Sequence, residues 1–212
     1  RQMCIRDSIN TAYVTNSDDT IQTGPLLSQF FIMTSGRTCV VNHQYDSYMS
    51  PFMIKLALDA GARCLDFDIT NHSYSKKAFP IVTISRDYDK KNLQHNFVLF
   101  EDAMRVLSTE WLKNQTGSAK RDPLFLRLSL DEGVTSDCMD QIAYLLQFYL
   151  NEQHGNHLLP VQWNYKSVRE DGGLGIYPIC SFFDYIVIMV KSPHRALSPL
   201  LDGMVNMLWT YD

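Results

Sequence analysis

The alternation of strand-like and helix-like segments constrains the fold of this chain more than any other feature. Apolar residues concentrate in strand-like runs at Cys64–Ile69, Leu124–Leu130 and Tyr185–Val190. Between these runs, around Phe100–Lys113 and after Ser136, apolar residues recur at the three- and four-residue spacing of a helix. Because parallel strands need a crossover connection that is usually helical, this order predicts an α/β fold built on a parallel sheet.

Local signals place the remaining elements. Ser50-Pro51 supplies a cap residue and a first-turn proline for a helix that Gly61 ends, and Ser136 is the expected cap of a later helix. We also expect two short strands, an irregular stretch and a C-terminal helix, at Phe30–Thr34, Pro80–Ile84, Asn151–Ile176 and from Pro199.

The composition excludes several functional classes. The 212 residues are 45% hydrophobic and 20% charged with a net charge of −4, which is enough apolar material for one sizeable core. A mildly acidic chain without a lysine and arginine cluster argues against nucleic acid as the main partner. No apolar run is long enough for a transmembrane segment, and the N-terminus has no signal-peptide core. The five scattered cysteines favour a reducing compartment.

Asp66 and Asp68 lie at the end of the strand that begins at Cys64. Residues two apart share one face of a strand, so the two carboxylates lie together while Leu65 and Phe67 point to the other side. Two adjacent carboxylates repel each other, and a metal ion or an arginine would relieve the repulsion. The alternative is a strand end whose two acids are solvated.

Five motifs follow one another along the chain in an ordered set. They are Gln29–Ser35, Gly61–Asp68, Pro80-Ile81-Val82, Asp122–Leu126 and the late strand ending at Lys191. In this order they resemble the X region of phosphatidylinositol-specific phospholipase C. The chain is similar to divergent copies carried by large DNA viruses of algae, which share an Asp-Pro-Leu-Phe strand and a step like Val205-Asn206-Met207. The resemblance implies a TIM-type (β/α) barrel of the phospholipase C-like phosphodiesterase superfamily, with an active site at the carboxyl ends of the strands.

On this basis the chain divides into four parts. Arg1–Ser8 reads as the translation of a sequencing adapter and is left out of the fold. Residues 9–24 are a polar lead-in, residues 25–191 form the barrel region, and residues 192–212 begin the next barrel segment, which we expect to be truncated. About five strands precede Asp212, whereas a closed barrel needs eight, so we expect an incomplete barrel with an exposed late edge.

The resemblance also implies hydrolysis of a phosphoinositide with the help of two histidines. One takes the proton of the inositol 2-hydroxyl and the other protonates the leaving diacylglycerol oxygen. In the eukaryotic branch, an asparagine and three carboxylates hold a calcium ion that supports the reaction. The three carboxylates match Asp66, Asp68 and Asp131.

Both histidine positions are replaced in this chain. The His-Asn pair falls at Gly36-Arg37, and the second histidine falls near Arg86. Glycine has no side chain to exchange a proton, and arginine stays protonated in proteins. We therefore expect impaired catalysis and weak or absent calcium binding.

Three further residues have two interpretations each. His72 and His95, in the loops expected after their strands, are either solvated loop residues or relocated acid–base groups. Arg127 either faces solvent or points into the barrel, where it would pair with Asp66 or Asp68 in place of the cation.

The arginines also suggest a function without catalysis. Arg37, Arg86 and Arg127 together would form a cup for an anion such as a phosphate headgroup. The chain is thus predicted to be either a weak phosphodiesterase for phosphoinositide-type lipids or a non-catalytic module that binds a phosphate, a lipid headgroup or a protein. A purely structural role predicts a pocket plugged by aromatic side chains such as Tyr45, Tyr48 or Tyr88.

Overall fold

A seven-stranded sheet forms the centre of the computed structural model, which describes residues 3–4, 24–41, 48–74, 77–84, 96–113, 122–153, 155–169, 172–191 and 196–209. The strands follow the order β6-β5-β4-β7-β8-β9, and β3 pairs with the first residues of β4. Their bounds are β3 (Thr34–Ser35), β4 (Cys64–Tyr74), β5 (Lys77–Val82), β6 (Val98–Leu99), β7 (Leu124–Leu130), β8 (Ile186–Lys191) and β9 (Met207–Trp209). A separate short pair joins β1 (Met3–Cys4) and β2 (Phe30–Phe31).

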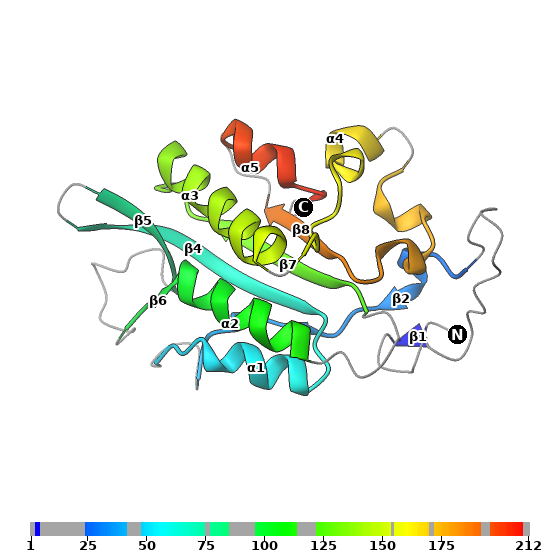
Figure 1. Cartoon of the computed structure of the whole chain (residues 1–212), viewed down its shortest axis with the longest axis horizontal. Coiled ribbons are helices and arrows are strands. Elements are labelled where there is room, and N and C mark those ends of the chain that lie inside the picture. The colour runs from blue at the N-terminus through cyan, green and yellow to red at the C-terminus, as the bar shows by residue number, and fades with distance from the viewer. Residues whose placement is uncertain are drawn as a thin grey trace.

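Helices connect the parallel strands. They are α1 (Phe52–Asp59), α2 (Phe100–Lys113), α3 (Ser136–Gln147), α4 (Tyr165–Val168) and α5 (Pro199–Met204). Helices α1, α2 and α3 lie along one side of the sheet (Figure 1). A π-helical turn extends α3 over Phe148–Glu152, and short 3-10 turns occur at Leu27–Gln29, Val161–Trp163, Leu174–Ile176 and Ile179–Phe182.

None of the helices described has both the length and the apolar character that a membrane crossing requires.

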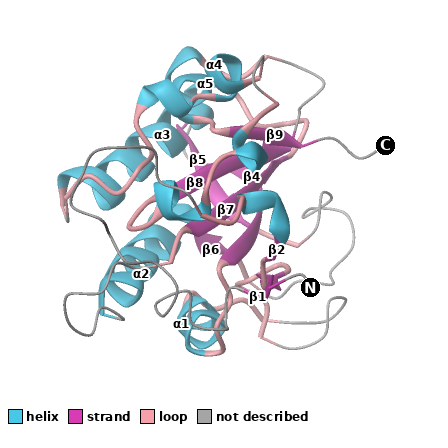
Figure 2. Ribbon diagram, turned by 90° about the vertical axis from the view of Figure 1, so that its right-hand side faces the viewer, coloured by secondary structure: helices cyan, strands magenta, loops and turns pink. Residues whose placement is uncertain are grey.

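The parallel strands form an open barrel. β3, β4, β7, β8 and β9 run parallel, and each is followed by a connection that contains a helix, apart from β9. A closed barrel of this type needs about eight such strands. Within the described residues β9 pairs only with β8 and β3 only with β4, so the sheet does not close. The expectation of an incomplete (β/α) barrel is confirmed, and β9 forms its late edge (Figure 2).

A β-hairpin interrupts the alternation of strands and helices. The strand expected at Pro80–Ile84 is β5, which starts earlier and runs antiparallel to β4. β4 itself continues beyond its expected end at Ile69. Only two residues separate β4 from β5, which is too few for a helical crossover, so the strands pair antiparallel. As a consequence His72 lies within β4 opposite Phe79, and its expected place in a loop was wrong.

The helix ends follow local side-chain chemistry. The cap of α3 is Thr135, one residue before the expected Ser136, and its Oγ1 accepts a hydrogen bond from the backbone N–H of Cys138 at 3.3 Å. Helix α1 begins at Phe52 with Pro51 at its N-cap position, one residue later than expected from Ser50 as the cap and Pro51 in the first turn. The chain leaves α1 through Gly61, whose φ of 94° lies in the left-handed region that glycine adopts without steric strain.

Apolar side chains on the two faces of the sheet form two clusters. Leu65 and Phe67 of β4 are fully buried on the outer face, in the cluster that includes α1, α2 and α3. Cys64, Phe125 and Val187 point to the inner face and join a second cluster. The alternation predicted for β4 is therefore confirmed, with apolar residues outside and the two aspartates inside.

The strand register arranges the inner face in rows. The row nearer the amino ends of the strands contains Asp66, Arg127, Met189 and Met207. Two residues further along each strand, the next row contains Asp68, Ser129, Lys191 and Trp209. The polar side chains of the inner face are thus concentrated at the carboxyl ends of the strands.

Candidate functional site

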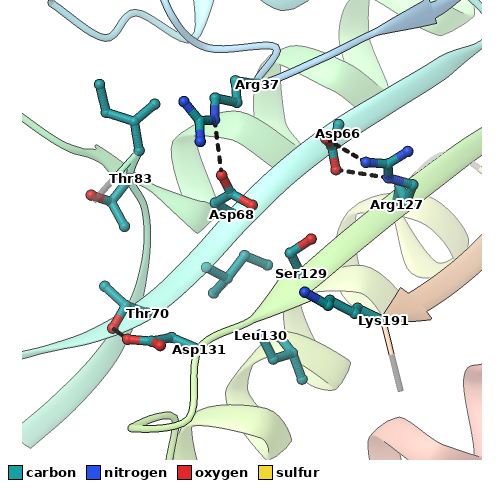
Figure 3. Close-up of a pocket in the computed structure, with 12 residues that line it drawn as sticks. Arg37, Asp66, Asp68, Thr70, Thr83, Arg127, Ser129, Leu130, Asp131 and Lys191 are labelled. Carbon is teal, nitrogen blue, oxygen red and sulfur yellow. Dashed lines mark hydrogen bonds and ion pairs between the residues drawn. The ribbon is translucent and has the colours of Figure 1, made fainter. Parts of the chain in front are cut away.

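The carboxyl ends of the strands surround a pocket of about 270 Å³. Its walls come from β4, β7 and β8, from the loop after β3 and from the residues that follow β5 (Figure 3). The polar and charged side chains that line it are Arg37, Asp66, Asp68, Thr70, Thr83, Arg127, Ser129, Asp131 and Lys191. The fold thus brings the three predicted carboxylates to one rim.

Asp66 and Arg127 form a bidentate ion pair across neighbouring strands. Nε and Nη2 of Arg127 donate to the two carboxylate oxygens of Asp66 at 3.1 and 3.0 Å. The two residues are direct partners in the register of β4 and β7, so their side chains start side by side. The Asp66 side chain is only 10% exposed, and a charge this buried needs a partner. Of the two interpretations of Arg127, the one in which it points into the barrel is correct.

The loop after β3 is tied to the same strand. Thr38 Oγ1 accepts a hydrogen bond from the backbone N–H of Asp66 at 3.0 Å and donates one to the carbonyl of Ser35 at 2.9 Å. This anchor holds Arg37 at the rim, where its Nε lies 3.4 Å from Oδ2 of Asp68 (Figure 3). Arg37 has a φ of 48°, a left-handed conformation that is uncommon for residues other than glycine and is often found at functional sites.

Asp68 is in an unfavourable place for a negative charge. Burial raises the pKa of its carboxyl above the usual value, and the neighbouring Asp66 raises it further. The positive charges of Arg37 and Arg127 and a hydrogen bond from Ser129 oppose this rise without cancelling it. Asp68 therefore depends on a cation more than an ordinary surface aspartate does.

Asp131 is turned to the edge of the pocket. Its Oδ2 accepts a hydrogen bond from Oγ1 of Thr70 at 3.3 Å, and its Oδ1 accepts one from the backbone N–H of Glu132 at 2.8 Å. In Figure 3 the carboxyl group of Asp131 lies toward Thr70, away from the Asp66–Arg127 pair. The three carboxylates share one rim, but each is held by a different partner.

One comparison decides the family. The model of the phosphatidylinositol-specific phospholipase C X domain matches residues 24–154, which include all the pocket residues described above except Lys191. The chain belongs to this family. The resemblance inferred from the order of motifs is confirmed. A comparison of the chain with curated proteins found no match.

Solved phospholipases C share the fold of this X domain. PLC21 from L. pealei aligns with a TM-score of 0.60 and 16% identity, over 87% of this chain and 24% of its own. PLC21 from S. officinalis aligns with a TM-score of 0.60 and 17% identity, over 87% and 24%. A calcium-dependent phosphoinositol-specific phospholipase C from Pseudomonas sp. aligns with a TM-score of 0.52 and 10% identity, over 85% and 65%. The chain thus spans about a quarter of the length of the two PLC21 proteins.

Two of the three carboxylates are paired with arginines, and the third, Asp131, accepts hydrogen bonds from Thr70 and the backbone of Glu132. Asp66 gives both oxygens to Arg127, and Asp68 is paired with Arg37. Calcium takes about six to eight oxygen ligands from one cluster. Within the described ranges, no group of three or more His, Cys, Asp or Glu side chains is placed to hold a metal ion. As arranged, these residues do not fit calcium.

Of the residues considered for proton transfer, the structure describes Gly36 and His72 but not Arg86 and His95. Gly36 lies in the loop before Arg37, and a Cβ added to it would meet no atom within 4 Å. Arg86 and His95 lie outside the described residues. His72 packs between the rings of Phe79 and Phe97, with ring centroids 5.4 and 5.0 Å away. It does not line the pocket.

The other aromatic candidates do not fill the pocket either. The structure describes two histidines, His72 and His157. His157 does not line the pocket, and its Nδ1 lies 3.2 Å from the carbonyl of Asp184, before β8 begins. Tyr48 is 61% exposed and does not line the pocket, so it does not plug it. Tyr45 and Tyr88 lie outside the described residues.

Two residues of the site were missed in the sequence. Lys191 ends β8 and lines the pocket, and Trp209 of β9 lies beside it in the sheet. The Cζ atom of Arg127 is 4.2 Å from the centroid of the Trp209 ring. The two-residue alternation along β8 would have placed Lys191 on the inner face, had it been extended from Val187. No local signal pointed to Trp209, because its contact depends on β9 joining the sheet.

Proposed function

We propose that the pocket binds the phosphate of a phosphoinositide-type headgroup through its arginines and turns over the phosphodiester slowly or not at all. The observation that carries the proposal is the pair of guanidinium groups, Arg127 on Asp66 and Arg37 on Asp68, in a pocket that neither described histidine lines. The family membership supports the choice of a phosphodiester as the ligand.

Proton transfer is the step that these residues support least. Hydrolysis by this family requires a group that takes a proton from the attacking hydroxyl and one that gives a proton to the leaving oxygen. Arg37 stays protonated, and Gly36 has no side chain. Each missing acid–base group lowers the rate by about 10²–10⁴-fold, and fixed positive charge alone recovers only part of this.

Binding of the anion is what the arginines support best. Nε and Nη2 of Arg127 serve Asp66, and within the described part of the chain its Nη1 amino group makes no hydrogen bond. Guanidinium groups offer paired donors that match the oxygens of a phosphate. The cations Arg37, Arg127 and Lys191 face the anions Asp66, Asp68 and Asp131, so the charges of the described rim balance. Affinity then comes from fixed donors rather than from excess charge, and we expect it to be modest and independent of calcium.

Binding is tested with the full chain and vesicles of phosphatidylinositol in phosphatidylcholine, with vesicles of phosphatidylcholine alone as the reference. Soluble glycerophosphoinositol and inorganic phosphate, titrated by calorimetry, separate headgroup binding from binding of free phosphate. We expect binding to phosphatidylinositol vesicles and to glycerophosphoinositol, unchanged by a calcium chelator, and its loss in Arg127→Met. Equal binding to both kinds of vesicle would reject the inositol phosphate headgroup as the ligand of the pocket.

Turnover is tested beside a variant that restores the family residues, Gly36→His/Arg37→Asn/Arg86→His. A Cβ added at Gly36 meets no atom within 4 Å, so the first atom of the new side chain causes no clash. We expect release of inositol phosphate by the unmodified chain to be undetectable or lower by orders of magnitude than in an active family member. Robust release by the unmodified chain, lost in His72→Ala or His95→Ala but not in the distant His157→Ala, would instead establish relocated catalysis.

A further inference from the structure

We infer that Trp209 is the positioning residue of the headgroup site, and that it holds the guanidinium of Arg127 in place for the anion. This inference rests on the proposed function, since it assigns to Arg127 the anion that the pocket binds. It adds a residue from β9, which follows the segment that the family model matches.

The guanidinium of Arg127 is held by Asp66 and lies over the ring of Trp209. Its edge donates to both oxygens of Asp66, at 3.1 and 3.0 Å. Its Cζ atom lies 4.2 Å from the ring centroid of Trp209, well within the roughly 6 Å over which a cation is attracted to an aromatic face. The indole ring therefore restricts a movement of the guanidinium that the hydrogen bonds to Asp66 leave free.

The register of the sheet explains how Trp209 reaches Arg127. Along the inner face, Arg127 lies opposite Met189, and Met189 lies opposite Met207. Trp209 is two residues beyond Met207 and so projects from the same face. A side chain as large as tryptophan, set one row higher and two strands away, reaches the arginine.

The same ring also approaches the second cation of this wall. Lys191 is the direct register partner of Trp209, and its Nζ lies 6.0 Å from the ring centroid. One aromatic side chain thus contacts or approaches two of the three cationic side chains that line the pocket, while the third, Arg37, is on the opposite side of Asp68 (Figure 3).

This arrangement favours a positioning role over simple packing. Arginine loses much side-chain freedom when it binds an anion, and a site that already fixes the side chain loses less on binding. Because Asp66 occupies Nε and Nη2, the orientation of the guanidinium plane also sets where Nη1 lies. An apolar residue of similar size at position 209 would fill space but would offer no π-face to hold that plane.

The test compares Trp209→Leu and Trp209→Phe in the full chain, with Trp163→Leu as the matched control. Trp163 packs on Tyr177 and Phe182, with ring centroids 4.8 and 5.3 Å away, and does not line the pocket. Binding of glycerophosphoinositol is measured by calorimetry. The side-chain Nε–H resonance of Arg127 is followed by NMR, since the ring current of the indole shifts it without any ligand.

We expect Trp209→Leu to weaken binding by roughly 3- to 30-fold and to move the Arg127 resonance toward its usual position. Trp209→Phe should recover part of both effects, and Trp163→Leu should leave both unchanged. Undiminished binding by Trp209→Leu, while Arg127→Met no longer binds, would overturn the inference and leave the proposed function standing.

Two other outcomes are also decisive. If the unmodified chain binds neither glycerophosphoinositol nor phosphatidylinositol vesicles, the proposed function fails, and the headgroup role of Trp209 fails with it. An Arg127 resonance that is the same in Trp209→Leu as in the unmodified chain overturns the positioning contact whether or not a ligand binds. Should Trp209→Leu not fold, Trp209→Met is used, because its flexible side chain fills the site without an aromatic face.

Discussion

The two ends of the inner face of the sheet have opposite chemistry. At the amino ends, β4, β7 and β8 contribute apolar residues to one buried cluster, namely Cys64, Phe125 and Val187. Two and four residues later, the same strands contribute most of the charged wall of the pocket, namely Asp66, Asp68, Arg127 and Lys191. The change occurs in each strand without a change in backbone geometry, because every second residue faces inward.

The difference shows which end provides stability and which end provides a site. The amino end buries apolar side chains that gain free energy on leaving water. The carboxyl end holds Asp68, whose pKa is raised by burial and by Asp66, so its negative charge opposes folding. We conclude that the apolar end offsets the electrostatic strain of the polar end.

The largest effect is expected from a variant that creates a cavity at the amino end. Phe182 is fully buried in the inner cluster. We expect Phe182→Ala to lower the free energy of unfolding by about 3–5 kcal/mol, because the transfer free energy is lost and a cavity remains. Urea unfolding followed by far-UV circular dichroism measures the change. Phe31→Ala, at a residue 60% exposed, is the control and should change stability by less than about 0.5 kcal/mol. A loss below about 1 kcal/mol for Phe182→Ala would mean that this end does not carry the fold.

The second test removes a charge from the polar end. Arg127→Met leaves the carboxylate of Asp66, with a side chain only 10% exposed, without its bidentate partner. We expect a loss of about 2–4 kcal/mol, less than for a fully enclosed pair because Arg127 is 27% exposed. The double variant Asp66→Asn/Arg127→Met should recover at least half of it in the same urea assay, because no unpaired charge remains. Equal destabilisation of the single and double variants would show that Arg127 acts through packing alone.

Most of the amino end and of the outer face could be predicted from the sequence. The apolar alternation along β4 and the helical spacing in α2 are local patterns, and the structure confirms both. The hairpin was missed because its signal was a short separation between two strands, not a residue pattern. Once β4 is extended into the hairpin, His72 is carried away from the pocket, so a small error in strand length changed one candidate site residue.

The contacts of the polar end depend on register, which the sequence does not specify. Asp66 and Asp68 were recognisable as a pair on one face, and Arg127 as a residue that could face them. Only the pairing of β4 with β7 decides that Arg127 meets Asp66 rather than Asp68. The alternation along β8 places Lys191 on the inner face, but its contact with Trp209, and that of Trp209 with Arg127, require two further strands in register.

The third test breaks the ion pair at the amino end, for comparison with Arg127. Nε of Arg63 lies 3.3 Å from Oδ2 of Asp122, and the two side chains are 24% and 28% exposed. This pair is monodentate and partly hydrated, so Arg63→Met should lower the free energy of unfolding by only about 1 kcal/mol. Urea unfolding of Arg63→Met and Arg127→Met in one buffer gives the comparison. Equal losses for the two variants would remove the distinction between the ends.

The smallest effect expected is a pH dependence that comes from Asp68, which is 33% exposed in its side chain. Because burial and Asp66 raise the pKa of this carboxyl in the folded state, the folded chain holds a proton at Asp68 at pH values where the unfolded chain has released it. The free energy of unfolding therefore falls as pH rises from about 4, the usual pKa of an aspartate, through the raised value.

Asp68→Asn removes this dependence. The variant should therefore gain stability relative to the unmodified chain across that range and keep the gain at pH 7, with no gain below about pH 4. Urea unfolding from pH 3.5 to 8 measures it. Asp122→Asn is the comparison at the amino end, since burial also raises the pKa of Asp122 and its effect should have the same sign. If Asp68→Asn were less stable than the unmodified chain at pH 7, the ion pair with Arg37 would outweigh burial, and the polar end would not oppose folding.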